Sequence, residues 1–237
     1  SEDYDAWAEL GNKGWGYNDI LPFFKKSESH EQIDKVDSGF HGTKGELSVT
    51  LPTKFKTPYV DEFISACENN GIPKNDDYNG IVQQGAGVVH STIKNGKRHS
   101  GAAAFLKPIL KRYNLTTITN AKVCKIILNK NVAVAVDYIK GTKKIQVNAN
   151  KEIIVSAGAF QSPQLLMLSG IGDSSELNKH GIECLHELKG VGKNLQDHLF
   201  YPICAQSKTN KGINHYISPL KQLKAAWNYF VNKKGVF

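Results

Sequence analysis

The residues best suited to bind a ligand are a run of small side chains between an apolar stretch and a segment with helix-start signals. Residues 153–155 are Ile-Ile-Val, and residues 156–159 are Ser-Ala-Gly-Ala. A turn without bulky side chains lets a ligand approach the backbone closely. The N-terminus of a following helix adds unpaired N–H groups and partial positive charge, which suit a phosphate or an electron-rich ring. The pattern therefore predicts a ligand-binding turn, and small residues that serve only packing are the alternative.

The elements that must position this turn are predicted from the residues on either side of it. Residues 152–156 are too few for a helix and rich in β-branched side chains, which predicts a central strand buried on both faces. Ser162 is placed to act as the N-cap of a helix, with Pro163 at the first helical position. Gly170 is placed to end that helix. We therefore expect a strand, a tight turn and a helix, in that order.

Other elements are predicted from strand periodicity, caps and turn residues. A β-meander is expected, because strand-like segments alternate with joints that contain Asn or Gly. The expected strands are residues 115–119, 122–128, 132–139, 143–149 and 152–156, and the three-stranded meander among them returns into the central strand over residues 152–156. A helix is expected over residues 57–70, with Thr57 as its cap, and another over residues 219–232. The pair Asn95-Gly96 predicts a tight hairpin.

Composition argues against several classes of function. The 237 residues carry a formal net charge of +8 from 30 Lys and Arg, of which only Arg98 and Arg112 are arginine. The lysines are scattered, whereas nucleic-acid binding favours a basic stripe with interleaved aromatic residues. The four cysteines lie far apart, so neither a zinc site nor a redox dithiol is expected. No apolar run reaches the length of a membrane span.

Two strings resemble the glucose-methanol-choline (GMC) flavin oxidoreductases. Residues 158–172, GAFQSPQLLMLSGIG, are similar to the second signature of that family over its whole length. Residues 190–198, GVGKNLQDH, are similar to its PGVGxNLQDH element, although Lys189 stands where the family usually has Pro. The loss of that rigid φ angle is expected to loosen the turn slightly. The resemblance covers essentially the whole chain and corresponds to the middle of a family member.

The resemblance implies an α/β fold: a partial FAD-binding Rossmann-like domain with an inserted β-meander, interleaved with part of an α+β substrate domain. It assigns residues 40–79 and 104–199 to the FAD-binding domain. Residues 1–39, 80–103 and 200–237 are then segments of the substrate domain or of the flavin lid. FAD is the implied cofactor, and the backbone of Val123 is expected to bond its adenine. The other implied cofactor-binding residues are Ala157, Gly158, Ala159, Asn194 and Asp197.

The implied function is that of a segment of an FAD-dependent oxidoreductase. Such an enzyme oxidises the CH–OH group of an alcohol or sugar and passes a hydride to flavin N5. The sequence contains no G-x-G-x-x-G after a strand, which also argues against an NAD-dependent Rossmann enzyme. The family's C-terminal catalytic region is not matched, so no catalytic residue is assigned and the segment alone is expected to be inactive. The alternative is a non-catalytic truncated relative that acts as an interaction protein.

The expected partner is a small alcohol or sugar substrate, with no nucleic acid and no membrane span. The oligomeric state and the electron acceptor stay open. The first residues do not resemble a signal peptide. A signal peptide upstream of Ser1 would make the protein secreted, so the localisation also stays open.

Overall fold

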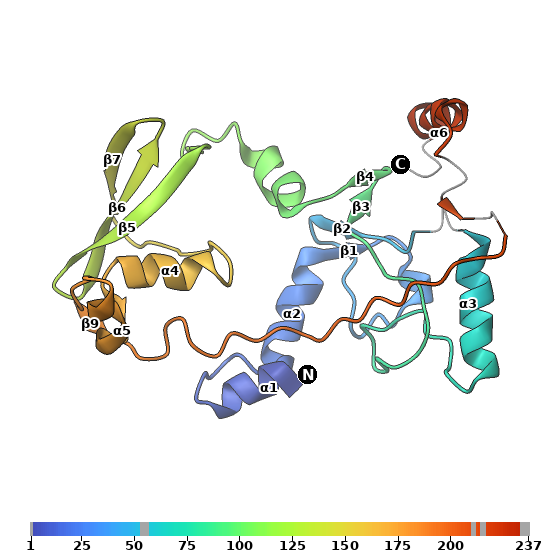
Figure 1. Cartoon of the computed structure of the whole chain (residues 1–237), viewed down its shortest axis with the longest axis horizontal. Coiled ribbons are helices and arrows are strands. Elements are labelled where there is room, and N and C mark those ends of the chain that lie inside the picture. Colours follow the sequence, from blue (N-terminus) through green and yellow to red (C-terminus); the bar gives the residue numbers. More distant parts are fainter. Residues whose placement is uncertain (1, 53–56, 210–211, 214–216, 233–237) are drawn as a thin grey trace. The chain divides into compact units, whose positions relative to one another are not determined.

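The computed structural model describes residues 2–52, 57–209, 212–213 and 217–232 (Figure 1). Its contacts divide the chain into two compact units. The first comprises Ser1–Leu115 with Ala205–Phe237, and the second is Thr116–Cys204. Within the described residues no helix is both long enough and apolar enough to cross a membrane.

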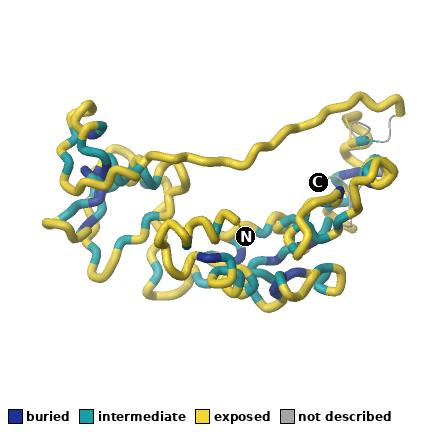
Figure 2. The backbone as a smooth tube through the Cα atoms, turned by 90° about the horizontal axis from the view of Figure 1, so that it is seen from below, coloured by how far each residue is buried: buried dark blue, intermediate teal, exposed yellow. Residues whose placement is uncertain are grey.

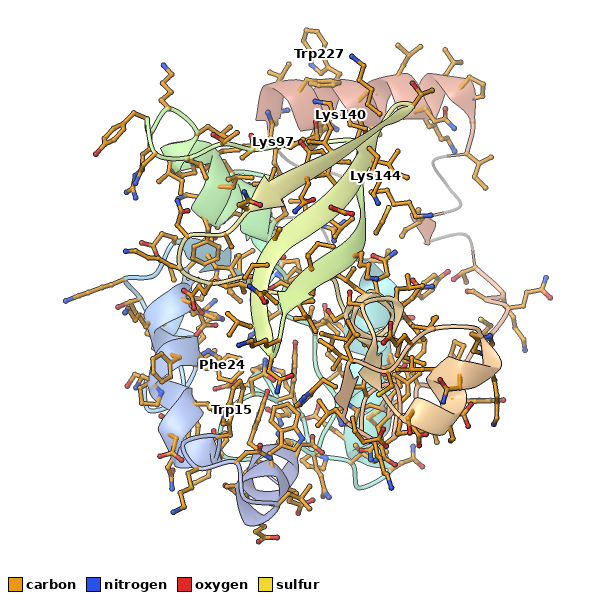
Figure 3. All side chains as sticks on the ribbon, turned by 90° about the vertical axis from the view of Figure 1, so that its left-hand side faces the viewer. Trp15, Phe24, Lys97, Lys140, Lys144 and Trp227 are labelled. Carbon is orange, nitrogen blue, oxygen red and sulfur yellow. The ribbon has the colours of Figure 1, made fainter. Side chains whose placement is uncertain are left out.

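The first unit begins with two helices that are held together by aromatic contacts. These are α1 (Glu2–Glu9) and α2 (Tyr17–Ser27). The Tyr4 ring on α1 lies 5.3 Å from the Trp7 ring and 5.9 Å from the Phe24 ring on α2, measured between centroids. Trp15, in the connection between the helices, and Phe24 border one cavity beside these helices (Figure 3). These aromatic contacts pack α1 against α2.

A short parallel pair of strands follows α2 and brings the chain back against the end of that helix. It consists of β1 (Glu28–His30) and β2 (Leu47–Val49), separated by a single 3₁₀ turn, η1 (Ile33–Lys35). The turn before β2 approaches α2 so closely that a Cβ atom on Gly42 would lie 1.8 Å from the Lys25 carbonyl oxygen. The Gly42 oxygen also accepts a hydrogen bond from the His30 N–H at 2.8 Å. Glycine is therefore required at this position by backbone contact.

The remaining elements of the first unit agree with their local sequence signals. The helix α3 (Pro58–Asn69) follows Thr57, and α6 (Pro219–Asn232) has the bounds predicted for it. The hairpin of β3 (Ile93–Lys94) and β4 (Lys97–Arg98) turns at Asn95 and Gly96, which both have positive φ angles. A π-helical turn, η2 (Ala102–Leu106), and a 3₁₀ turn, η3 (Lys107–Ile109), come next. On α6, Tyr229 donates a hydrogen bond to the Gly96 oxygen at 3.1 Å, and Trp227 projects away from the helix (Figure 3).

The second unit is built on the predicted meander. Its antiparallel strands are β5 (Ala121–Asn129), β6 (Val132–Lys140) and β7 (Lys143–Asn148), in that spatial order. The joints are tight, with φ angles of +54° at Lys130 and +61° at Gly141. Four short elements complete the unit: α4 (Gln161–Leu168), β8 (Ile171–Gly172), α5 (Ser174–Lys179) and β9 (His186–Glu187), with β8 and β9 parallel. Its core includes Ile126, Ala135 and Leu177, all at most 3% exposed.

The prediction of a central strand over residues 152–156 is wrong. These residues form no strand and pair with no described segment, and Ile154 is 78% exposed. Residues 115–119 are likewise not a strand. A strand buried on both faces is stabilised by parallel neighbours and by covering helices, which are non-local contacts. No described residue supplies such a neighbour here, so local β propensity alone does not produce the strand.

The close approach at Gly42 yields a test of the first unit. We expect Gly42→Ala to lower the free energy of unfolding by about 1–3 kcal/mol or more, because backbone must move to admit the methyl group. The matched control is Gly101→Ala, since Gly101 has a helical φ angle of −51° and open space at its Cβ position. The control should be neutral or stabilising by up to about 1 kcal/mol. Urea denaturation followed by circular dichroism measures both, and equal effects would contradict this packing.

Candidate functional site

The second unit contains an open cavity of about 850 Å³ beside α4. This volume lies in the range of sites that bind small molecules and cofactors. One wall is formed by Ala159, Phe160 and α4 itself, and another by the loop that leads to Leu195. The polar side chains at its border are Ser162, Gln164, His180 and Lys193. The cavity is therefore mainly apolar with a few polar groups at its edge.

The turn that leads into α4 is fixed by Ser162, although not in the way predicted. The helix begins at Gln161, so Ser162 lies inside its first turn and is not the N-cap. Its Oγ atom instead accepts a hydrogen bond from the Ala157 N–H at 3.0 Å. Its own N–H donates to the Gly158 oxygen, also at 3.0 Å. Ser162 therefore closes the loop from Ala157 onto the helix, which holds the small-residue turn in one conformation.

Gly158 occupies a backbone conformation that other residues rarely adopt. Its φ angle is +91°, and a Cβ atom placed there would meet no protein atom within 4 Å. Glycine is therefore favoured at this position by the left-handed backbone conformation, and not by a lack of space for a side chain. A conformationally restricted turn with open space in front of it fits the close approach of a ligand to the backbone. The backbone of this turn is therefore accessible, as the ligand-binding interpretation requires.

Ser169 connects α4 to the meander and was missed by sequence reasoning. It is fully buried, and its Oγ atom accepts a hydrogen bond from the Ile126 N–H on β5 at 2.8 Å. The same hydroxyl donates to the Leu165 oxygen at 2.6 Å. The helix then ends as predicted at Gly170, whose φ angle is +83°. The only sequence signal for this link was a hydroxyl residue directly before the helix-ending glycine.

The meander is irregular next to Val123. Val123 pairs with Tyr138 on β6, but the next paired residue on β5 is Lys125, so Cys124 is an extra residue. Such a β-bulge interrupts the hydrogen-bonded ladder and redirects the strand, and bulges are common beside functional sites. Val123 is also 43% exposed. The structure therefore places a strand irregularity, which the sequence did not predict, at the residue expected to contact adenine.

The remaining predicted site residues lie in an extended, exposed part of the chain. Residues 192–209 are all exposed (Figure 2). Asn194 has a φ angle of +53°, and its neighbours Lys193 and Leu195 line the cavity together with Ala159. Asp197 accepts a hydrogen bond from the His198 N–H at 2.9 Å and does not line the cavity. Of the predicted site residues, Ala159 lines the cavity, and Gly158 and Asn194 are each adjacent in the sequence to a lining residue. Val123 and Asp197 lie outside the lining.

Charges at the edge of the cavity are balanced around Lys193. Asp173 caps α5 and has a lowered pKa, because its carboxylate accepts hydrogen bonds, first from the Ser175 hydroxyl. The pKa of Glu176 is also lowered, mainly by Lys179 at 3.0 Å. Lys193 lowers the pKa of both carboxyl groups further. One cationic side chain therefore stands at the cavity edge among ionised carboxylates.

Residues 1–200 of the chain match the GMC oxidoreductase family. The chain belongs to the GMC oxidoreductase family. An alcohol dehydrogenase (acceptor) of Pseudomonas putida is 40% identical over 238 residues, which cover 99% of this chain and 42% of that protein. The mitochondrial choline dehydrogenase of Homo sapiens is 42% identical over 199 residues, 84% of this chain and 33% of the human protein.

The solved structures confirm the fold class for this GMC chain. An FAD-dependent oxidoreductase from Chaetomium thermophilum superposes with a TM-score of 0.88 at 28% identity, over 99% of this chain and 43% of that one. The predicted partial α/β FAD-binding domain is therefore confirmed. FAD is the cofactor of this fold. The chain spans less than half the length of these relatives.

The buried hydroxyl of Ser169 allows a direct test of how the site is supported. We expect Ser169→Ala to lower the free energy of unfolding by about 1–3 kcal/mol, because it leaves the Ile126 N–H buried without a partner. Ser65→Ala, on an exposed face of α3, is the matched control and should change stability by less than about 0.5 kcal/mol. Urea denaturation compares the two variants. A Ser169→Ala protein as stable as the control would show that this link does not hold α4 in place.

Proposed function

We propose that the protein containing this chain oxidises the CH–OH group of a small alcohol with FAD as its cofactor, and that this chain supplies part of the flavin-binding surface. The observation that carries the proposal is the turn at Gly158, with its positive φ angle and open space, in a chain of the GMC family. Bound FAD would supply the hydride acceptor for alcohol oxidation.

The residues of this chain would bind and orient the cofactor. The backbone of Ala157, Gly158 and Ala159 would face it, because these side chains leave the backbone accessible. The backbone of Val123, next to the bulge, would hydrogen-bond the adenine. Asn194 and Asp197 would lie against its flavin end. The family resemblance supports these assignments, together with the cavity that Ala159 shares with the loop around Asn194.

The assignment of segments to domains is part of the same proposal. Residues 40–79 and 104–199 would belong to the FAD-binding domain. Residues 1–39, 80–103 and 200–237 would form parts of the substrate domain or cover the flavin. The bridge from Ser169 to β5 supports a common domain for α4 and the meander.

The substrate class rests on the named activities of the relatives. Several similar proteins are alcohol or choline dehydrogenases, so a primary or secondary alcohol is the proposed substrate and a sugar is the alternative. A panel of aliphatic alcohols, amino alcohols and aldoses, assayed with an artificial electron acceptor, separates the two. Turnover of none of them by a flavin-loaded protein would favour the non-catalytic relative instead.

The flavin contact is tested by Gly158→Val. The added side chain would occupy the space in front of the turn, so we expect flavin bound per folded protein to fall about tenfold or more, equivalent to about 1.4 kcal/mol of lost binding. The matched control is Gly141→Val in the β6–β7 turn, where φ is also positive and the Cβ position is also open. The control should lose similar stability but keep its flavin.

Flavin absorbance divided by folded protein, measured by circular dichroism on the same samples, gives the comparison. A Gly158→Val protein that folds and keeps full flavin would remove the cofactor role of this turn. Equal flavin losses in both variants would show that stability alone controls flavin content.

A further inference from the structure

A buried histidine in the first unit lies between two carboxylates. His41 is 5% exposed, and its Nδ1 atom lies 3.0 Å from Glu28 Oε2. Its Nε2 atom lies 3.0 Å from Asp77 Oδ1. A carboxylate can only accept, so both ring nitrogens must donate, which requires the charged imidazolium. No spacing pattern in the sequence indicates these two partners of His41.

Two further histidines beside His41 form a chain whose tautomers are fixed by their hydrogen bonds. His30, 4% exposed, accepts from the Gln32 N–H at its Nδ1 atom, 3.2 Å away. Its Nε2 atom must therefore carry the proton and donate to His90 Nδ1 at 3.3 Å. His90 in turn donates from Nε2 to the backbone carbonyl oxygen of Asp76 at 2.8 Å. Both rings are thus neutral, since a proton on His90 Nδ1 would face the N–H of His30.

These contacts join segments that are distant in the sequence. Glu28 and His30 belong to β1, whereas Asp77 and His90 belong to the segment of residues 76–90. Part of this segment, residues 79–84, lines a cavity of about 800 Å³ within the first unit. Glu28 and His41 line the same cavity, together with aromatic residues such as Tyr4 and Phe40. The histidine cluster therefore lies at the base of this loop.

We propose that Glu28, His30, His41, Asp77 and His90 form a proton-operated latch, which holds residues 76–90 on β1 only while His41 is charged and the other two histidines are neutral. Loss of either protonation state releases the segment and opens the cavity that residues 79–84 border. The latch does not involve the flavin turn, and it operates whichever substrate the protein oxidises. Within the described residues no three side chains are arranged to hold a metal ion, so a structural metal does not replace the latch.

The pKa shifts of His30 and His41 set an acid and an alkaline limit to the pH range in which the latch is closed. Burial lowers the pKa of His30, and the neighbouring charge of His41 lowers it further, although Glu28 and Asp77 act in the opposite direction. Burial also opposes the charge on His41, but hydrogen bonds and attraction from Glu28 and Asp77 outweigh it and raise its pKa. The pKa of Asp77 is lowered overall, because hydrogen bonds from the Asp37 N–H and from His41 outweigh its burial.

The signs of these shifts follow from linkage. His30 has a lowered pKa, so its contribution to stability is present above the unfolded value of about 6.5 and is lost as the pH falls through the folded value. His41 has a raised pKa, so its contribution is present below about pH 6.5 and is lost as the pH rises through its folded value. Hydrogen-exchange protection of residues 76–90 should therefore be greatest between an acid limit set by His30 and an alkaline limit set by His41.

Protonation states in the intact, flavin-loaded protein test the proposal without any substitution. Long-range ¹H–¹⁵N correlation spectra of the histidine rings at pH 7 should show two protonated nitrogens on His41. They should show protonated Nε2 and unprotonated Nδ1 on His30 and on His90. A neutral His41 ring, or the opposite tautomer on His30, would overturn the latch.

Hydrogen exchange then tests whether the protonation states control the segment. After correction for intrinsic rates, protection of the 76–90 amides should first rise and then fall as the pH is increased. Asp77→Asn should move its alkaline limit down by about one pH unit or more, because one anion next to His41 is lost. The matched control Asp76→Asn removes the same charge from the adjacent residue, whose side chain is paired with Lys74. Protection that is flat with pH, or equal shifts in both variants, would overturn the proposal.

Discussion

The hydrogen bond from the Ile126 backbone to the Ser169 hydroxyl is the constraint on which the candidate site depends. It is fully buried, and it joins the meander to the end of the helix that carries the small-residue turn. A buried N–H that loses its partner costs about 1–3 kcal/mol, so this contact fixes how α4 lies against β5. Ser162 then fixes the turn at the other end of the same short helix. The position of Gly158 follows from these two hydroxyl groups.

The first unit depends on close backbone contact in a similar way. The absence of a side chain at Gly42 lets the turn before β2 lie directly against the end of α2. This approach brings His41 between Glu28 and Asp77, because Gly42 also donates its N–H to Glu28 at 2.9 Å. One glycine therefore allows a buried ionic cluster to form, and the charges within that cluster satisfy one another.

Elements with strong local signals were predicted well from the sequence. The helix α3 follows a Thr cap and an N-terminal Pro, and the hairpin at Asn95-Gly96 adopts the positive φ angles that these residues favour. The meander was predicted because each joint contains Asn or Gly. The family strings located the turn at residues 157–159 and the loop at Asn194, which border or adjoin one cavity in the structure.

Features that depend on distant contacts could not be predicted in this way. The strand over residues 152–156 requires parallel neighbours, and no described residue provides them. The helix cap assigned to Ser162 was wrong because its hydroxyl binds the turn behind it instead of the helix in front. The cluster around His41 joins residues from 28 to 90, and no spacing pattern in the sequence connects them. The bulge at Cys124 depends on the register with β6, which strand periodicity does not reveal.

The central claim is that the backbone at Gly158 meets the cofactor without an intervening side chain. A crystal structure of the protein with bound FAD tests it most directly. We expect cofactor atoms within about 4 Å of the Gly158 backbone, at van der Waals distance, with its φ angle still positive. Cofactor bound elsewhere, with the space in front of Gly158 filled by another part of the protein, would contradict the claim and leave this turn with a packing role only.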